Sequence, residues 1–166
     1  DLGHEDKPGT DVVTGTDDPG AGPWSQDGSS HGTHVSGTIN ALDNEIGVIG
    51  VFPSVQMHIV RVFGNDGNWA YSSELINAVD DCVSNGARVI NMSLGGPFPS
   101  RVLKKAVEYA HKKGVVVVCA AGNESRGKVG YPAAYPGAIA VGTDAIYWVN
   151  EGTADKPDGA IVRIRK

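Results

Sequence analysis

The chain has 166 residues, a formal net charge of −5, 40% hydrophobic residues and 20% charged residues. This length and balance predict one globular domain with a core of its own and exclude a disordered chain. The acidic balance argues against a nucleic-acid partner, which would need a basic stripe. No apolar run approaches the roughly 18 residues that cross a bilayer, so we expect no membrane partner either.

The first half of the chain predicts loops, then a helix and two strands. Residues 1–30 are rich in turn-forming residues, with one short strand expected at 11–13. A helix is predicted over 31–42, with Ser29 or Ser30 as its cap. Strands are predicted over 46–51 and 55–63.

The second half alternates helices and strands. Helices are predicted over 71–84, ending at Asn85-Gly86, and over 100–113, ending at Gly114. The inward side chains we expect are Leu75, Ile76, Val79 and Val83 in the first, and Val102, Leu103, Ala106, Val107 and Ala110 in the second. Strands are predicted over 88–92, 115–121 and 138–142, and the unbroken apolar run of the second of these suggests cover on both faces.

Strands that alternate with helices predict an α/β fold, three-layered, with a mainly parallel sheet and helices on both faces. Residues 143–166 break the pattern and form a polar tail, which is interpreted as a loop, an edge hairpin or a frayed end. Cys82 and Cys119 make no disulfide framework, and we interpret both as buried apolar thiols.

Three segments could carry chemistry. His31 begins a predicted helix in His31-Gly32-Thr33-His34, where it could serve as a general base, as a capping or core histidine, or as half of a zinc pair that lacks further ligands. Asn123 follows an apolar strand, where its amide could donate to an oxyanion or merely form a turn. Ser93 follows another strand, but Asn91 stands where a nucleophile elbow needs glycine.

Together and in this order, the segments resemble the subtilisin-like serine proteases. The matching segments are His31-Gly32-Thr33-His34-Val35-Ser36-Gly37-Thr38, 47–50, 89–96, 120–124 and Tyr131-Pro132-Ala133-Ala134-Tyr135-Pro136. The resemblance covers residues 4–142 and implies a partial catalytic domain over 1–142, followed by the tail over 143–166. It also implies an extracellular location and a cis bond between Tyr131 and Pro132.

The resemblance implies a role for each matching position. His31 corresponds to the general base and Asn123 to the oxyanion donor. An extended polypeptide substrate would lie as an added strand between two segments. The residues of these substrate-binding segments are Ser93, Leu94 and Gly95 on one side and Gly67, Asn68, Trp69 and Tyr71 on the other.

The resemblance also implies a bound Ca²⁺. Calcium takes roughly six to eight oxygen ligands, many of them carbonyls on a curved loop. The corresponding ligands are the Asp6 carboxylate, the Asn44 amide oxygen and the carbonyls of Leu42, Ile46 and Val48. Ala133, Tyr135 and Ala138 correspond to a weaker cation site. The alternative for residues 42–48 is an ordinary helix end followed by a polar turn.

The chain departs from the family at the nucleophile. The family's Gly-Thr-Ser-Met-Ala motif has no counterpart, and the last serine is Ser125. The orienting aspartate would be Asp1 or, as the match of His4-Glu5-Asp6 favours, a residue just upstream; we take the opening Asp1-Leu2-Gly3 as that of a processed or truncated product. We therefore expect a serine endopeptidase by family whose central part is inactive alone and whose partner is the rest of its own domain.

Two further hypotheses remain open: a non-catalytic module that binds peptides or calcium, and a hydrolase that uses Ser93 with His31. A truncated sheet would expose an edge and part of its core. We therefore expect marginal folding, association, or stabilisation by calcium.

Overall fold

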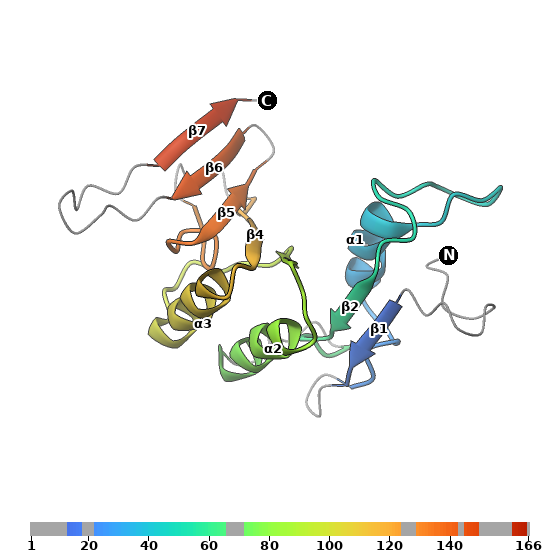
Figure 1. The fold of residues 1–166 in the computed structure, drawn as a ribbon, viewed down its shortest axis with the longest axis horizontal. Coiled ribbons are helices and arrows are strands. Elements are labelled where there is room, and N and C mark those ends of the chain that lie inside the picture. The colour runs from blue at the N-terminus through green and yellow to red at the C-terminus, as the bar shows by residue number, and fades with distance from the viewer. Residues whose placement is uncertain are drawn as a thin grey trace. The chain divides into compact units, whose positions relative to one another are not determined.

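A computed structural model describes residues 13–17, 22–65, 72–123, 129–142, 145–149 and 161–165. The chain divides into two compact units, Asp1–Glu74 and Leu75–Lys166. Figure 1 labels the elements in chain order, which are β1 Val13–Thr16, α1 His31–Asn40, β2 Met57–Val60, α2 Ser72–Ser84, β3 Val89–Met92, α3 Arg101–Lys112, β4 Val116–Ala120, β5 Ala138–Val141, β6 Ala145–Val149 and β7 Ile161–Arg165.

The first unit contains a parallel strand pair and one helix. Strands β1 and β2 pair in register from Val13 with Met57 to Thr16 with Val60. Helix α1 ends at Asn40, two residues earlier than predicted. Strand β2 is shorter than the predicted strand over 55–63. Strand β1 begins at Val13, the last residue of the predicted strand over 11–13, so the two overlap by that residue only.

The predicted strand over 46–51 is wrong. The backbone N–H groups of Gly50, Val51 and Phe52 donate to the carbonyls of Ala41, Thr38 and Ile39, each at 2.9 Å. These donors therefore satisfy the open carbonyls at the end of α1 instead of a neighbouring strand. Gly50 permits this approach, since a Cβ there would lie 2.6 Å from the Ala41 nitrogen.

The second unit is built on a five-stranded sheet in the order β3-β4-β5-β6-β7. The pairs β3–β4 and β4–β5 are parallel, and β5–β6 and β6–β7 are antiparallel. The prediction of an α/β fold with a mainly parallel sheet is confirmed. Within the polar tail, β6 and β7 form the edge hairpin, one of the three interpretations of that segment.

The core of the second unit lies along α2, α3 and the parallel strands. In α3, the side chains of Leu103, Ala106, Val107 and Ala110 are buried, as their spacing predicts. The predicted inward position of Val102 is wrong, since this side chain is 56% exposed. In α2, Leu75 and Val79 are buried, as is Ala78, whereas the predicted inward Ile76 and Val83 are half-buried.

Strand β4 alternates in burial, contrary to the prediction of cover on both faces. Val117 and Cys119 are buried, Val116 is 43% exposed, and Val118 and Ala120 are half-buried. The strand therefore has one buried face and one partly exposed face.

Both thiols are free. Cys119 is buried, as predicted, whereas the predicted burial of Cys82 is wrong, since that residue is only half-buried. Burial raises the pKa of Cys119 to about 12, and burial together with the Asp81 charge raises the pKa of half-buried Cys82 to about 11. Neither thiol is therefore a reactive thiolate at neutral pH.

Glycines end both helices of the second unit. Gly86 has φ +80°, and the Ala87 N–H donates to the Cys82 carbonyl after α2. Gly114 has φ +79°, and the Val115 N–H donates to the Ala110 carbonyl after α3. Only glycine adopts this left-handed conformation without strain, which is why the sequence located both ends correctly.

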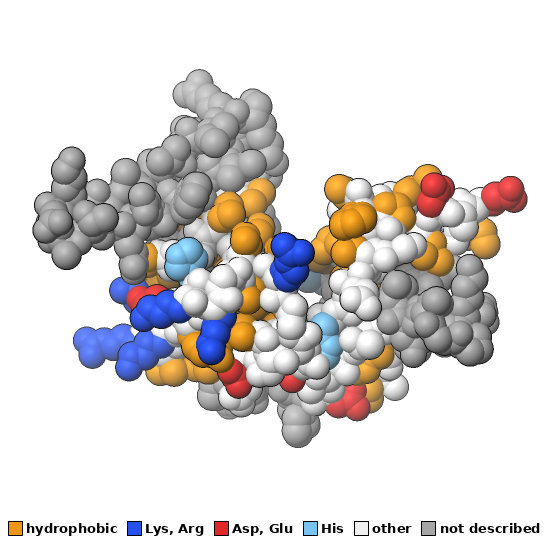
Figure 2. Space-filling model, in the orientation of Figure 1, with side chains coloured by type: hydrophobic (Ala, Val, Ile, Leu, Met, Phe, Trp, Pro, Cys, Tyr) orange, Lys and Arg blue, Asp and Glu red, His pale blue; other side chains and the backbone are white. Residues whose placement is uncertain are grey.

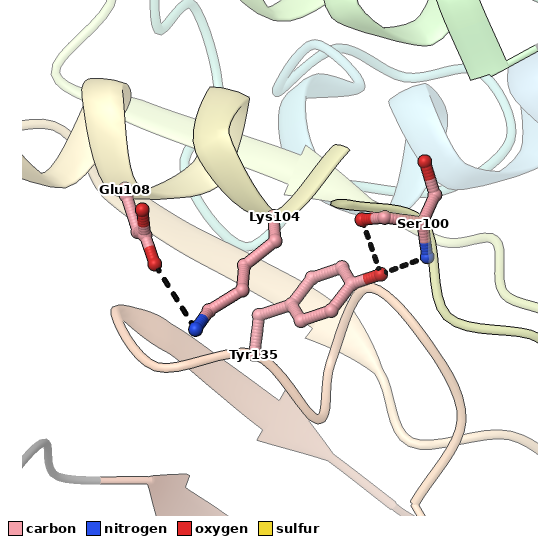
Figure 3. A network of polar contacts seen from close by, with 4 residues as sticks. All are labelled: Ser100, Lys104, Glu108 and Tyr135. Atoms are coloured by element: carbon pink, nitrogen blue, oxygen red, sulfur yellow. Dashed lines mark hydrogen bonds and ion pairs between the residues drawn. The ribbon is translucent and has the colours of Figure 1, made fainter. Parts of the chain in front are cut away.

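The start of α3 is held by two hydroxyls. The Ser100 side chain accepts the Leu103 N–H, and the Tyr135 hydroxyl accepts the Ser100 N–H and donates to the Ser100 carbonyl (Figure 3). Tyr135 is 4% exposed, so its hydroxyl pairs within the protein rather than with solvent. This ties α3 to the segment between β4 and β5.

The first unit leaves large apolar side chains exposed. Orange side chains gather around the segment after α1 in Figure 2. The exposed members are Ile46, Val48, Ile49, Val51 and Phe52, at 58–87%. In the part of the chain that the structure describes, no helix combines the length and apolar character needed to cross a membrane.

Candidate active site

His31 is the first residue of α1, and its side chain is exposed. The loop before it sets its position. Ser30 occupies the N-cap position, as one of the two predicted caps, with φ +62° and no capping bond from its side chain. The Ser29 hydroxyl instead accepts the His31 N–H at 3.4 Å.

Asp27 is the main acceptor at the start of α1. Its carboxylate accepts the Thr33 N–H at 2.8 Å and both the N–H and the hydroxyl of Ser29 at 3.1 Å. Burial alone would raise the pKa of Asp27, but the hydrogen bonds from Thr33 and Ser29 outweigh burial and lower that pKa to about 2. A carboxylate at a helix N-terminus is also favoured by the helix dipole. The sequence reasoning missed Asp27, although an aspartate shortly before a helix is a known capping signal.

Asn123 and the segment Ser93-Leu94-Gly95 lie at one edge of one sheet. Strands β3 and β4 are parallel neighbours, with Met92 paired to Cys119. Ser93 follows the carboxyl end of β3 directly, and Asn123 follows that of β4 after Gly122, whose φ is +101°. The Asn123 side chain is exposed. Carboxyl ends of parallel strands are where α/β proteins bind ligands.

A short antiparallel bridge follows the segment Ser93-Leu94-Gly95. The Gly96 N–H donates to the Tyr131 carbonyl at 2.8 Å, and the Tyr131 N–H donates to the Gly96 carbonyl at 2.9 Å. A Cβ at Gly95 would come within 3.3 Å of that Tyr131 carbonyl. The peptide bond between Tyr131 and Pro132 is cis, as the resemblance implied.

The Ser93 hydroxyl accepts a hydrogen bond from the Asn91 amide at 3.0 Å. A nucleophilic serine needs a base to take its proton, and an amide NH₂ cannot do so. This pairing gives no support to Ser93 as a nucleophile.

The loop after α1 is folded by local hydrogen bonds. The Leu42 carbonyl accepts the Asn44 N–H, and the Asn44 amide oxygen accepts the Ile46 N–H, both at 3.0 Å. Gly47, at φ +71°, provides the sharp turn. A carbonyl or amide oxygen has two lone pairs. The donor set of carbonyls and one amide suits a hard cation such as Ca²⁺.

Several predicted site residues lie outside the described residues: Asp6, Gly67, Asn68, Trp69 and Tyr71. Asp1 lies there as well. His31 belongs to the first unit, and Asn123 with Ser93, Leu94 and Gly95 belongs to the second. The convergence of His31 and Asn123 on one groove stays a prediction.

The weaker cation site stays a prediction too. Ala133, Tyr135 and Ala138 are buried in the second unit, and the Ala138 N–H donates to the Tyr135 carbonyl at 3.2 Å. Within the described ranges, no three His, Cys, Asp or Glu side chains gather into a metal-binding group.

The model of the subtilase family matches residues 4–146. The chain belongs to the subtilase family. It is 54% identical over 121 residues to subtilisin E of Bacillus subtilis, covering 70% of this chain and 32% of that protein. It is 44% identical over 142 residues to subtilisin Savinase of Lederbergia lenta, covering 86% of this chain and 52% of that protein. The chain thus spans about a third to a half of the length of these two relatives.

Solved subtilases share the fold. The psychrophilic subtilisin-like protease Apa1 from the Antarctic psychrotroph Pseudoalteromonas sp. AS-11 superposes with a TM-score of 0.73 at 37% identity, covering 83% of this chain and 38% of that one. The S218A mutant of the protease domain of PatA superposes with a TM-score of 0.67 at 27% identity, covering 92% and 64%. The fold is therefore a truncated subtilisin-like α/β fold.

Proposed function

We propose that this chain is the central part of a serine endopeptidase that hydrolyses peptide bonds through an acyl-enzyme, with His31 as general base and Asn123 as oxyanion donor. The observation that carries the proposal is the placement of Asn123 and Ser93-Leu94-Gly95 at the carboxyl ends of adjacent parallel strands, in a subtilase. That edge presents an amide donor next to backbone on which a peptide can lie.

Each group contributes a separate step. The His31 imidazole takes the proton of a serine hydroxyl as that oxygen attacks the scissile carbonyl, and it returns the proton to the leaving amine. The Asn123 NH₂ donates to the oxygen on which negative charge develops. Removing such a donor costs on the order of 3 kcal/mol of transition-state stabilisation, a magnitude that itself comes from a subtilisin.

The serine itself is the missing part. No residue after Ser125 is a serine, so residues 126–166 supply no nucleophile. Without a triad, oxyanion stabilisation and substrate binding leave only a small fraction of the catalysis. We expect this chain alone to be inactive, with the rest of its own protease domain as its partner. A fluorophosphonate probe should leave the purified chain unlabelled, and stoichiometric labelling would overturn the proposal.

The intact mass of the protein isolated from its source separates the main hypotheses. A mass well above 17.3 kDa would support a protease of which this chain is one part. A mass of 17.3 kDa would favour the non-catalytic module that binds peptides or calcium. The same preparation should be found in the medium rather than in cells, since the family resemblance implies an extracellular location.

Replacing Ser93 tests the remaining hydrolase hypothesis. Under the proposal, Ser93→Ala only weakens the binding of an extended peptide, because Ser93 contributes backbone and packing to the substrate segment. If Ser93 were the nucleophile, the same change would abolish any hydrolysis that the chain shows. Isothermal titration with a non-cleavable peptide analogue and a hydrolysis assay together give the answer.

We further propose that the loop over residues 42–48 binds Ca²⁺. The carbonyls of Leu42, Ile46 and Val48 and the Asn44 amide oxygen would hold the ion, together with the Asp6 carboxylate. Bound calcium would stiffen the end of α1. At about 100 times its dissociation constant, a ligand of the folded state stabilises by about 2.7 kcal/mol.

A matched pair of variants tests the calcium site. Asn44→Ala removes a proposed ligand, whereas Asp43→Ala removes an exposed neighbour outside the ligand set. The melting temperature should rise with calcium and fall with chelator in the parent chain and in Asp43→Ala, but not in Asn44→Ala. A parent chain whose melting ignores chelator would exclude the site.

A further inference from the structure

Arg61 and Asn65 join the loop that carries His31 to the strand pair of the first unit. Arg61 follows the end of β2 directly, and its guanidinium donates in three directions. The Nε group donates to the Phe63 carbonyl at 2.9 Å, Nη1 to the Pro23 carbonyl at 3.2 Å, and Nη2 to the Asn65 amide oxygen at 2.6 Å. Arginine can serve three separate acceptors because its donors form a rigid planar fork.

Asn65 completes the connection. Its amide oxygen also accepts the Gly28 N–H at 3.2 Å, so one oxygen receives donors from the residue after β2 and from the loop before α1. The approach is so close that a Cβ at Gly28 would lie 2.5 Å from that oxygen. The loop is therefore held at Pro23 and again at Gly28.

The next residues pass this placement on to His31. Gly28 lies between Asp27 and Ser29 in the chain. The Asp27 carboxylate accepts the N–H groups of Ser29 and Thr33. The Ser29 hydroxyl accepts the His31 N–H. The path from Arg61 to the first turn of α1 is thus an unbroken series of hydrogen bonds and single peptide links.

We propose that Arg61 and Asn65 are positioning residues that fix the first turn of α1 and with it the His31 imidazole. This inference rests on the proposed role of His31 as general base. Asn65 also stands two residues before Gly67, the first residue of the segment that the resemblance assigns to substrate binding.

The experiment uses the isotope-labelled full chain and NMR. Asn65→Leu removes the shared acceptor, and Asn65→Asp restores an oxygen at the same place. In Asn65→Leu, we expect the amides of Gly28, Ser29 and Thr33 to exchange with solvent about tenfold faster or more. The ring signals of His31 should shift and broaden, and Asn65→Asp should bring both readouts back.

The controls separate positioning from a general loss of structure. His58 lies on β2 in the same unit, with its ring nitrogens 3.1 Å and 3.2 Å from the hydroxyls of Thr14 and Thr16, and its signals should not move. Arg88→Lys changes an exposed arginine of the second unit and should leave His31 unchanged. Arg61→Lys keeps the charge but loses the planar set of guanidinium donors. Its effects on amide exchange and on the His31 signals should therefore resemble those of Asn65→Leu.

The outcomes are decisive in either direction. His31 signals that stay unchanged in Asn65→Leu would overturn the proposal, even if Gly28 exchanges faster. Gly15 and Ile59 pair between β1 and β2. If Arg61→Lys also shifts their signals, that variant disturbs the strand pair itself, and only the two Asn65 variants then test the proposal. These readouts involve no catalysis, so an intact mass of 17.3 kDa would count against the protease function without changing this result.

Discussion

The two units of the chain differ in how they satisfy the requirements of folding. In the second unit, buried apolar side chains run through α2, α3 and the strands from β3 to β5, and the buried Tyr135 hydroxyl has partners. In the first unit, Val13 and Ala41 are the buried hydrophobic residues among those described, and large apolar side chains from Ile46 to Phe52 are exposed.

This difference shows where the stability of the chain comes from. Burial of apolar surface is the main favourable contribution to folding, so the second unit carries most of it. The first unit relies on hydrogen bonds such as those of Asp27, Arg61 and Asn65, each of which contributes only about 1 kcal/mol. Its buried Asn40 amide has no partner, whereas every other described buried side-chain polar atom has one.

A cavity in the second unit should produce the largest effect. Leu103→Ala removes a side chain that is 7% exposed and should cost about 2–5 kcal/mol in the free energy of unfolding. Val102→Ala, next to it on α3 but 56% exposed, should change that free energy by no more than about 0.5 kcal/mol. Urea unfolding followed by circular dichroism measures both. Equal effects would show that α3 does not pack as described.

Removing the Tyr135 hydroxyl should have the next largest effect. Tyr135→Phe leaves the Ser100 N–H without its partner, while the Ser100 carbonyl keeps the Lys104 N–H, and should cost about 1–3 kcal/mol. Lys104→Ala is the matched control, because it removes only a surface ion pair with Glu108 at 3.4 Å (Figure 3). That pair should contribute only a few tenths of a kcal/mol, because it lies at the surface and because Lys before Glu is the less favourable order on a helix. The same urea titration ranks the two variants, and a larger loss for Lys104→Ala would contradict the prediction.

Asn40 should respond in the opposite direction. It is fully buried with an unpaired amide, so Asn40→Leu, of similar size, should raise the stability of the first unit by about 1 kcal/mol. Hydrogen exchange of the α1 amides measures this locally. A clear loss of protection would mean that a buried water or another polar group pairs with Asn40.

The smallest effect should appear in acid. The pKa of Asp27 is lowered from 3.8 to about 2, so its ionised form stabilises the start of α1 above pH 4, and that stabilisation disappears as the pH falls toward 2. The Ser29 and Thr33 amides should lose protection in that window. Asp27→Asn cannot titrate and should show no such step. A step of equal size in Asp27→Asn would assign it to another carboxyl.

Local pattern located most elements of the fold. The stripe of Leu103, Ala106, Val107 and Ala110 predicted α3, and Gly86 and Gly114 marked the helix ends through their left-handed conformation. The strand predicted over 46–51 failed because its apolar residues favour a strand locally, while their N–H groups bond to the end of α1. No local pattern contains that long-range partner.

The candidate site also contains residues that the sequence predicted and residues that it did not. The motifs around His31 and Asn123, with the strands before and after them, identified the family from the sequence alone, because these residue types at this spacing are chemically restrictive. Asp27 was missed although it bonds only to nearby Ser29 and Thr33. Arg61 and Asn65 were missed because their partners Pro23 and Gly28 are brought to them only when the chain is folded. Sequence determined which side chains could do chemistry here, and tertiary structure decided what holds them, because hydrogen bonds between distant residues depend on geometry that no single segment contains.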